Sequence, residues 1–226
     1  MSTLRPKIIG IFSRPTETFG SIDEKPDWLF PFLILIVVSI LSLVITYHKV
    51  LLPEQIAKVT EMGNLTEEQL AKAREMMGGM RGILLSLVGI IITVPLFLFL
   101  KSGIFLVFSN ILGGESTFRK VLSVSSWALL IEVTEIIVKT PIMFLKLSSQ
   151  VITSLALFFP FLSYKSLTFK ILNKFDFFTI WELALIGIGL SIVSKFSIKK
   201  GECIVFSLWI IWIIISVTGS KFMPGL

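Results

Sequence analysis

Residues 28–47 read WLFPFLILIVVSILSLVITY, a run of twenty residues without a charged side chain. At ~1.5 Å per residue, a helix of this length extends ~30 Å, which matches the hydrocarbon core of a bilayer. Trp28 and Tyr47, at its two ends, are residue types enriched at the membrane–water interface. The run therefore predicts a membrane-spanning helix, and it decides the fold class.

The rest of the chain repeats this pattern. Of its 226 residues, 54% are hydrophobic and 16% charged, and the mean hydropathy is +0.89, which excludes a soluble globular protein. We expect an all-α, polytopic integral membrane bundle of five transmembrane helices in the cell membrane. The spans are predicted at about 28–47, 82–112, 121–143, 177–194 and 203–220.

Residues 1–27 are predicted to form an amphipathic N-terminal tail. Apolar residues recur there at near-helical spacing, and Pro15 is suited to the first turn of a helix. One interpretation is a short helix in the headgroup plane, and the other is an irregular tail packed on the domain.

Two further segments are too short or too polar to span. Residues 53–80 alternate in charge and include Thr66 and Gln69 at the spacing of a capping box, which predicts an extramembrane helical pair that faces a partner or forms a solvated cap. Residues 151–162 are apolar, contain Pro160, and are predicted to be re-entrant or interfacial.

Charge and rare residues narrow the function classes. The net charge is +6, with basic residues spread between the spans, so we expect contact with lipid headgroups and no nucleic-acid binding. The short connections 113–120 and 195–202 are net positive, which favours a cytoplasmic N-terminus. One cysteine and one histidine, His48, cannot form a disulfide or a metal centre, and we expect no cofactor.

No catalytic pattern is evident. The chain lacks Gly-x-Ser-x-Gly, and His48 has no evident Ser or Cys partner near it. The expectation is that the protein is not an enzyme.

Intramembrane charges are the strongest functional signal. Glu132 and Glu135 fall inside the third predicted span, with Lys139 following and Lys101 in the second. A charge at the centre of a bilayer costs ~2.5–3.5 kcal/mol on insertion scales, so each must be compensated. Glu135 and Lys139 have the favourable i, i+4 order. Glu132 is estimated to lie ~16–22 Å into the span, facing the bundle interior.

Proline and glycine positions predict structural roles. Pro95 is expected to kink or tilt the long second span. Gly113 and Gly114 can end it with a left-handed C-cap. Gly187 and Gly189 are expected to let another helix approach closely.

Three sequence motifs, taken in order along the chain, resemble the Yip domain of integral membrane proteins, in its prokaryotic form. They are residues 14–19 (RPTETF) followed by Trp28 and Pro31, residues 113–119 (GGESTFR, including Phe118), and residues 175–181 (FDFFTIW) followed by 185–190 (LIGIGL).

The resemblance implies five helices, a cytoplasmic N-terminus and a non-catalytic role in membrane organisation. Some bacterial members resemble accessory subunits of ABC-type exporters. The acidic-Leu-Tyr-Gly-Pro motif of eukaryotic members is absent, so binding to Rab GTPases is not expected.

Two functions remain open. One is a scaffold or accessory subunit in membrane organisation or a transport complex. Its partners would be the bilayer, other membrane proteins such as an ABC-type transporter, or further copies of the chain. The alternative is a small carrier or channel whose path is lined by Glu132 and Glu135.

Overall fold

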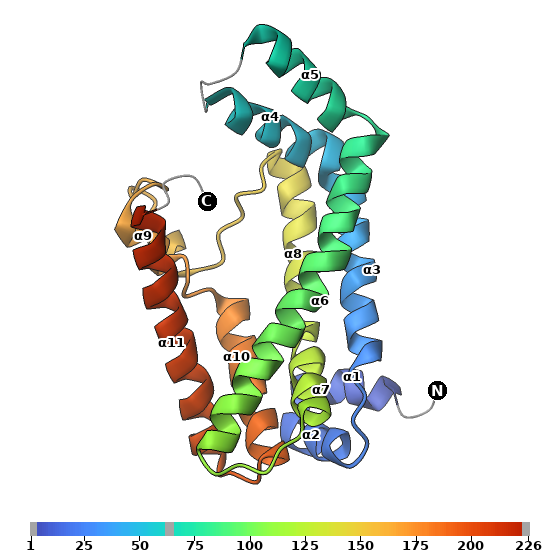
Figure 1. The fold of residues 1–226 in the computed structure, drawn as a ribbon, viewed down its shortest axis with the longest axis vertical. Helices are drawn as coiled ribbons and strands as arrows, with labels where there is room; N and C mark the ends of the chain where they lie inside the picture. The colour runs from blue at the N-terminus through green and yellow to red at the C-terminus, as the bar shows by residue number, and fades with distance from the viewer. Residues whose placement is uncertain (1–3, 62–65, 223–226) are drawn as a thin grey trace. The chain divides into compact units, whose positions relative to one another are not determined.

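The computed structural model describes residues 4–61 and 66–222, and these residues form helices and one isolated β-bridge, with no strand among them (Figure 1). The predicted helical membrane bundle is confirmed. Four stretches are long and apolar enough to cross a membrane, and a shorter apolar helix accompanies them.

The predicted spans correspond to the following helices. The first is α3 (Leu29–Thr46), which continues through a π-helical turn, η1 (Tyr47–Leu51), into α4 (Leu52–Glu61). The second is α6 (Met80–Ile111), and the third is a pair, α7 (Phe118–Ala128) and α8 (Leu130–Lys146). The last two are the shorter α10 (Phe177–Val193) and α11 (Ile198–Phe222).

The chain divides into two compact units. The first unit comprises Met1–Phe32, Leu98–Glu132 and Ile152–Leu226, and the second comprises Leu33–Phe97 and Val133–Val151. Each is described by itself below. Because the unit boundaries fall within α3, α6 and α8, each of these helices contributes residues to both units.

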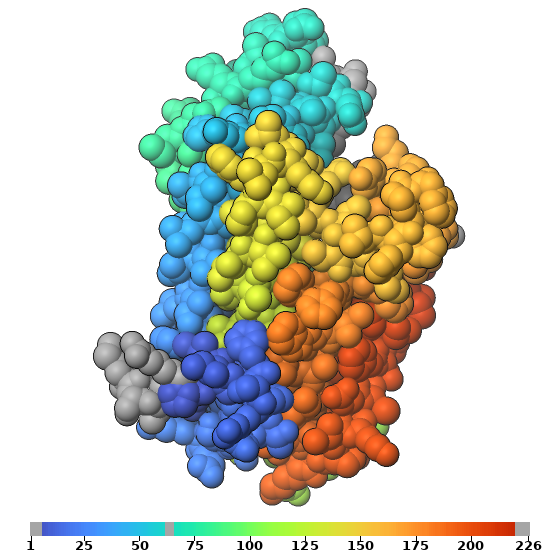
Figure 2. Space-filling model, turned by 180° about the vertical axis from the view of Figure 1, so that it is seen from behind, coloured from blue at the N-terminus to red at the C-terminus, as the bar shows by residue number. Residues whose placement is uncertain are grey.

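In the first unit the N-terminal tail forms two helices, α1 (Leu4–Ser13) and α2 (Pro15–Glu24), where the sequence predicted one. Arg14 breaks them with φ −144°, and Pro15 begins the second. Ile11, Phe19 and Ile22 are fully buried. Figure 2 shows this blue hairpin lying against the orange α10. The tail is therefore both helical and packed on the domain.

The core of the first unit is α7, whose residues Val121 to Ala128 are all buried, serines included. A Cβ on Gly189 of α10 would lie 2.5 Å from Val124 of α7 and 3.0 Å from Phe19 of α2. Glycine at this position thus allows α2, α7 and α10 to meet.

A second close approach joins α10 and α11. A Cβ on Gly201 would lie 2.5 Å from the carbonyl oxygen of Gly187 and 2.8 Å from Ser191, and a Cβ on Gly187 would meet the backbone of Glu202 at 3.0 Å. Small residues on both helices bring the two backbones together, as in membrane helix pairs.

Residues 151–162 are mostly irregular, with one turn of 3₁₀ helix, η2 (Leu155–Phe158). The isolated bridge pairs Ser154 with Asp176, and Asp176 also caps α10 by accepting from the backbone N–H of Phe178. A short helix that the sequence did not predict, α9 (Leu167–Leu172), follows. Phe158 and Phe161 are more than 70% exposed, and the interfacial placement stays a prediction.

The second unit contains the helical pair, α4 and α5 (Glu67–Gly78); residues 62–65 lie outside the described part. The predicted capping box of Thr66 and Gln69 is present. The Tyr47 hydroxyl donates to the carbonyl of Met77 at 2.7 Å, which ties the end of α5 to the π-helical turn.

Glu54 fixes the start of α4 to the end of α8. Its carboxylate accepts hydrogen bonds from the Ser148 hydroxyl at 3.1 Å, from the backbone N–H of Ser149 at 2.7 Å and from the Ser149 hydroxyl. Between α3 and α8, the hydroxyls of Ser42 and Thr140 lie 2.6 Å apart. The helical pair is therefore an anchored part of its unit.

Candidate intramembrane charge site

The clearest site in the first unit is an ion pair between α6 and α10. Lys101 Nζ lies 2.5 Å from Glu182 Oε1, and the two side chains are 30% and 15% exposed. Lys101 was predicted as an intramembrane charge, whereas Glu182 was not a predicted site residue. Its position, as the one acid within the apolar helix α10, is the signal that could have found it.

Glu132 joins this pair from a third helix. It lies in the first turn of α8 and interacts electrostatically with Lys101. The sequence left open whether this residue would be protonated, hydrated or paired with a cation from another helix; Lys101 lies on another helix, α6. Two carboxylates and one ammonium give the cluster a formal charge of −1.

The chain just before the first predicted span contacts the end of α7. The Trp127 indole donates to the carbonyl of Asp27 at 2.6 Å, and the Ser126 hydroxyl donates to that of Trp28 at 2.5 Å. The start of the first span is therefore level with Trp127 and not with the start of α7. Glu132 follows Trp127 by five residues, ~7.5 Å along a helix.

The sequence estimate of ~16–22 Å took the third span to begin between residues 117 and 121, and the depth of Glu132 in the membrane stays a prediction. The estimate counted α7 as membrane-crossing from its first residue. In the structure, α2 packs on α7, and Lys120 in the first turn of α7 pairs with Asp23 of α2 at 2.5 Å.

Glu135 and Lys139 belong to the second unit. Lys139 Nζ lies 2.5 Å from Glu135 Oε1, and both side chains are less than a quarter exposed. This pair lies along one helix, α8, at i, i+4 spacing, in the order that favours attraction between the two charges.

The Gly113-Gly114 motif packs on the connection between α10 and α11. Gly113 has φ +87°, the left-handed C-cap conformation. A Cβ on Gly114 would lie 2.8 Å from the Phe196 ring. Lys195 pairs with Glu115 at 3.1 Å, and Lys200 donates to the carbonyl of Leu112 at 2.7 Å. The motif thus holds two interhelical connections together.

Two other residues singled out from the sequence, Phe118 and Pro95, lie in helices. Phe118 starts α7, and its ring stacks on Phe99 with centroids 6.0 Å apart. Pro95 lies inside α6, which is continuous from Met80 to Ile111. Among the residues that the structure describes, no group of three His, Cys, Asp or Glu could hold a metal ion.

Comparison with known proteins identifies the family. Residues 9–219 match the Yip1 domain. The chain is also similar to membrane protein YknW of Bacillus subtilis (strain 168), with 28% identity over 208 residues, which cover 88% of this chain and 84% of YknW. The comparison with solved structures gave no significant match. The chain belongs to the Yip1 domain family of integral membrane proteins.

Proposed function

We propose that this protein is a non-enzymatic scaffold or accessory subunit of the cell membrane, which assists other membrane proteins and has no substrate of its own. The observation that supports it most is the Lys101–Glu182 ion pair. The two residues are 81 positions apart in sequence and lie on different helices. The main physical consequence of the pair is therefore to fix α6 against α10.

The positions of the surface pockets also support a scaffold function. Two pockets among the described residues lie on the α1–α2 hairpin and on the α4–α5 pair, and neither is lined by Lys101, Glu132 or Glu182. A carrier site is expected to be a cavity with convergent polar groups. Here the intramembrane charges face one another.

The helical pair is the proposed contact surface for a protein partner. None of its described residues is buried, yet Glu54 and Tyr47 anchor it firmly at both ends. An anchored but uncovered helix pair is suited to docking, and a membrane transporter of the ABC type or a second copy of the chain would be its partner.

The experiment is crosslinked co-purification from native membranes. We compare the wild type with Lys72→Glu/Arg74→Glu on α5 and with a matched control, Lys165→Glu/Lys174→Glu, whose lysines are also exposed. A specific partner lost only with the α5 variant supports the proposal. Equal recovery with both variants contradicts the docking surface.

The alternative, a small carrier or channel, rests on the net negative cluster of Lys101, Glu132 and Glu182. Reconstituted liposomes separate the two functions. Proton or cation flux that disappears in Glu132→Gln would overturn the scaffold function, whereas no flux above that of empty liposomes supports it.

A further inference from the structure

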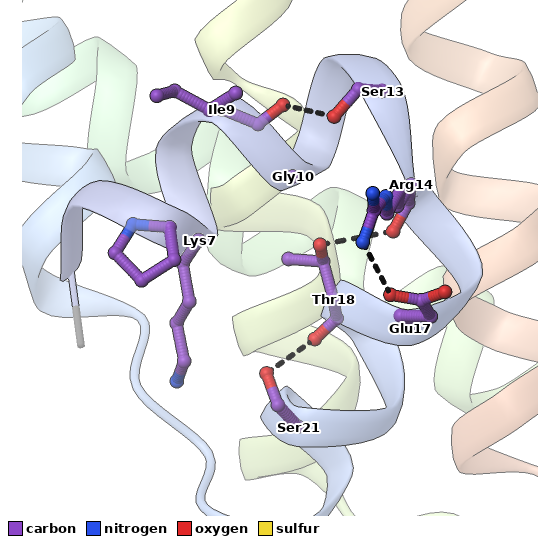
Figure 3. A pocket seen from close by; sticks show the side chains of 9 residues that line it. Lys7, Ile9, Gly10, Ser13, Arg14, Glu17, Thr18 and Ser21 are labelled. Atoms are coloured by element: carbon purple, nitrogen blue, oxygen red, sulfur yellow. Dashed lines mark hydrogen bonds and ion pairs between the residues drawn. The ribbon is translucent and has the colours of Figure 1, made fainter.

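A groove of about 590 Å³ lies between α1 and α2 (Figure 3). Lys7 lines one end of it, and Arg14 with Glu17 lines the other. Arg14 Nη1 is 3.8 Å from Glu17 Oε2, and both side chains are about three-quarters exposed, so this is a loose pair that a competing anion can open.

Hydroxyl groups form the wall of the groove. Ser13, Thr18 and Ser21 each donate to a backbone carbonyl three or four residues earlier, at 3.0, 3.0 and 2.7 Å. Their oxygens retain lone pairs that can accept from a ligand hydroxyl. A Cβ on Gly10 would lie 2.3 Å from Thr18 Oγ1, so glycine is what lets the two helices approach here.

The groove lies at the level where the first span begins. Lys7 Nζ is 5.8 Å from the ring of Trp127, and that ring donates to the carbonyl of Asp27, one residue before the apolar run. Ile9 and Phe12, on α1, are 67% and 39% exposed. A helix with exposed apolar residues, basic residues and this depth is typical of the headgroup region.

From the groove, its charge and its depth, we propose that α1 and α2 bind the headgroup of an anionic phospholipid. Arg14 pairs with the phosphodiester at one end of the groove, Lys7 supplies the second positive charge at the other end, and the hydroxyl wall accepts from a hydroxyl-bearing headgroup such as glycerol. Two cations and one carboxylate leave the groove at +1, which one phosphodiester neutralises. A zwitterionic headgroup brings no net charge and no hydroxyl.

The experiment measures lipid binding to the purified full chain by native mass spectrometry in detergent, with added phosphatidylglycerol or phosphatidylcholine. The expected result is one tightly bound phosphatidylglycerol, and no preference in Lys7→Gln/Arg14→Gln. At the strength of surface lysine–lipid contacts, each single change weakens binding about fivefold and the pair about thirtyfold. Glu17→Gln removes the competing carboxylate and tightens binding.

Control variants separate the effect of these two charges from general effects of charge removal and from misfolding. Lys165→Gln/Lys174→Gln, whose exposed lysines flank α9, removes two positive charges elsewhere and leaves the preference unchanged. Lys7→Arg/Arg14→Lys keeps the charges and retains binding, which separates charge from folding. Equal binding of both lipids, or equal loss with both Gln pairs, overturns the proposal. Soluble glycerol phosphate that binds as tightly as the lipid would make a free phosphate the ligand and also overturn it.

Discussion

The two intramembrane ion pairs have the same length and differ in what they join. Lys101 and Glu182 meet at 2.5 Å between two helices of the first unit, while Lys139 and Glu135 meet at 2.5 Å along a single helix of the second. A pair within one helix can form before tertiary structure, but a pair between helices requires the fold. The interhelical pair should therefore carry more of the stability.

The largest expected effect follows from Lys101→Leu. It leaves Glu182, 15% exposed, without its cation and removes the positive charge near Glu132. Loss of one partner of a buried pair costs roughly 3–5 kcal/mol, and we expect about 3 kcal/mol here because Lys101 is partly exposed. Equilibrium unfolding in mixed detergent micelles measures this loss of unfolding free energy.

The double variant Lys101→Leu/Glu182→Leu is the control for that change. Replacing a buried pair with apolar residues is often close to neutral, so it should recover more than half of the loss. A double variant as unstable as the single one would show that the lysine acts through packing and not through its charge.

The second prediction concerns the α10–α11 contact. In Gly201→Ala the new Cβ would lie 2.5 Å from the Gly187 carbonyl, so the helices must separate, at a cost of roughly 1–3 kcal/mol. Gly103→Ala is the matched control, since nothing lies within 4 Å of a Cβ there. The control should be neutral or stabilised by up to ~1 kcal/mol, in line with helix propensity. Equal stability of the two variants would contradict the close approach.

The third prediction concerns the Glu135–Lys139 pair within α8. Glu135→Gln keeps a hydrogen-bonding amide beside Lys139 and breaks a pair that lies within one helix, so it should lower the free energy of unfolding by only about 1 kcal/mol. The same unfolding measurement decides it. A loss as large as that of Lys101→Leu would remove the distinction between the two pairs.

Hydropathy alone predicted the helical membrane bundle, because a bilayer requires long apolar helices and the chain has few other apolar runs. It did not reveal Glu182, since an acid near the start of an apolar helix also suits an interface. Gly201 was missed for a similar reason: it lies beside Lys199 and Lys200, in what reads as a polar boundary. Such pairings depend on which helices meet, and hydropathy does not specify helix neighbours.

The N-terminal tail also shows that the sequence pattern does not specify which helices pack together. Pro15 was recognised as a helix start, and α2 begins there. The separate helix α1 was not recognised, and neither was the packing of α2 on α7. The depth predicted for Glu132 depends on where the segment before the first span lies relative to Trp127, and that contact is tertiary.

The smallest expected effect is that of Glu132→Gln. Lys101 already has Glu182 as its close partner, so the amide keeps a hydrogen-bonding group while the cluster changes from −1 to neutral. In a scaffold this should alter the free energy of unfolding by less than ~0.5 kcal/mol and leave the co-purified partner unchanged. Glu132→Leu, which loses the polar group, should destabilise more. A Gln variant that folds and keeps its partner but loses the cellular phenotype would assign an ionisation step to Glu132, and with it the carrier function.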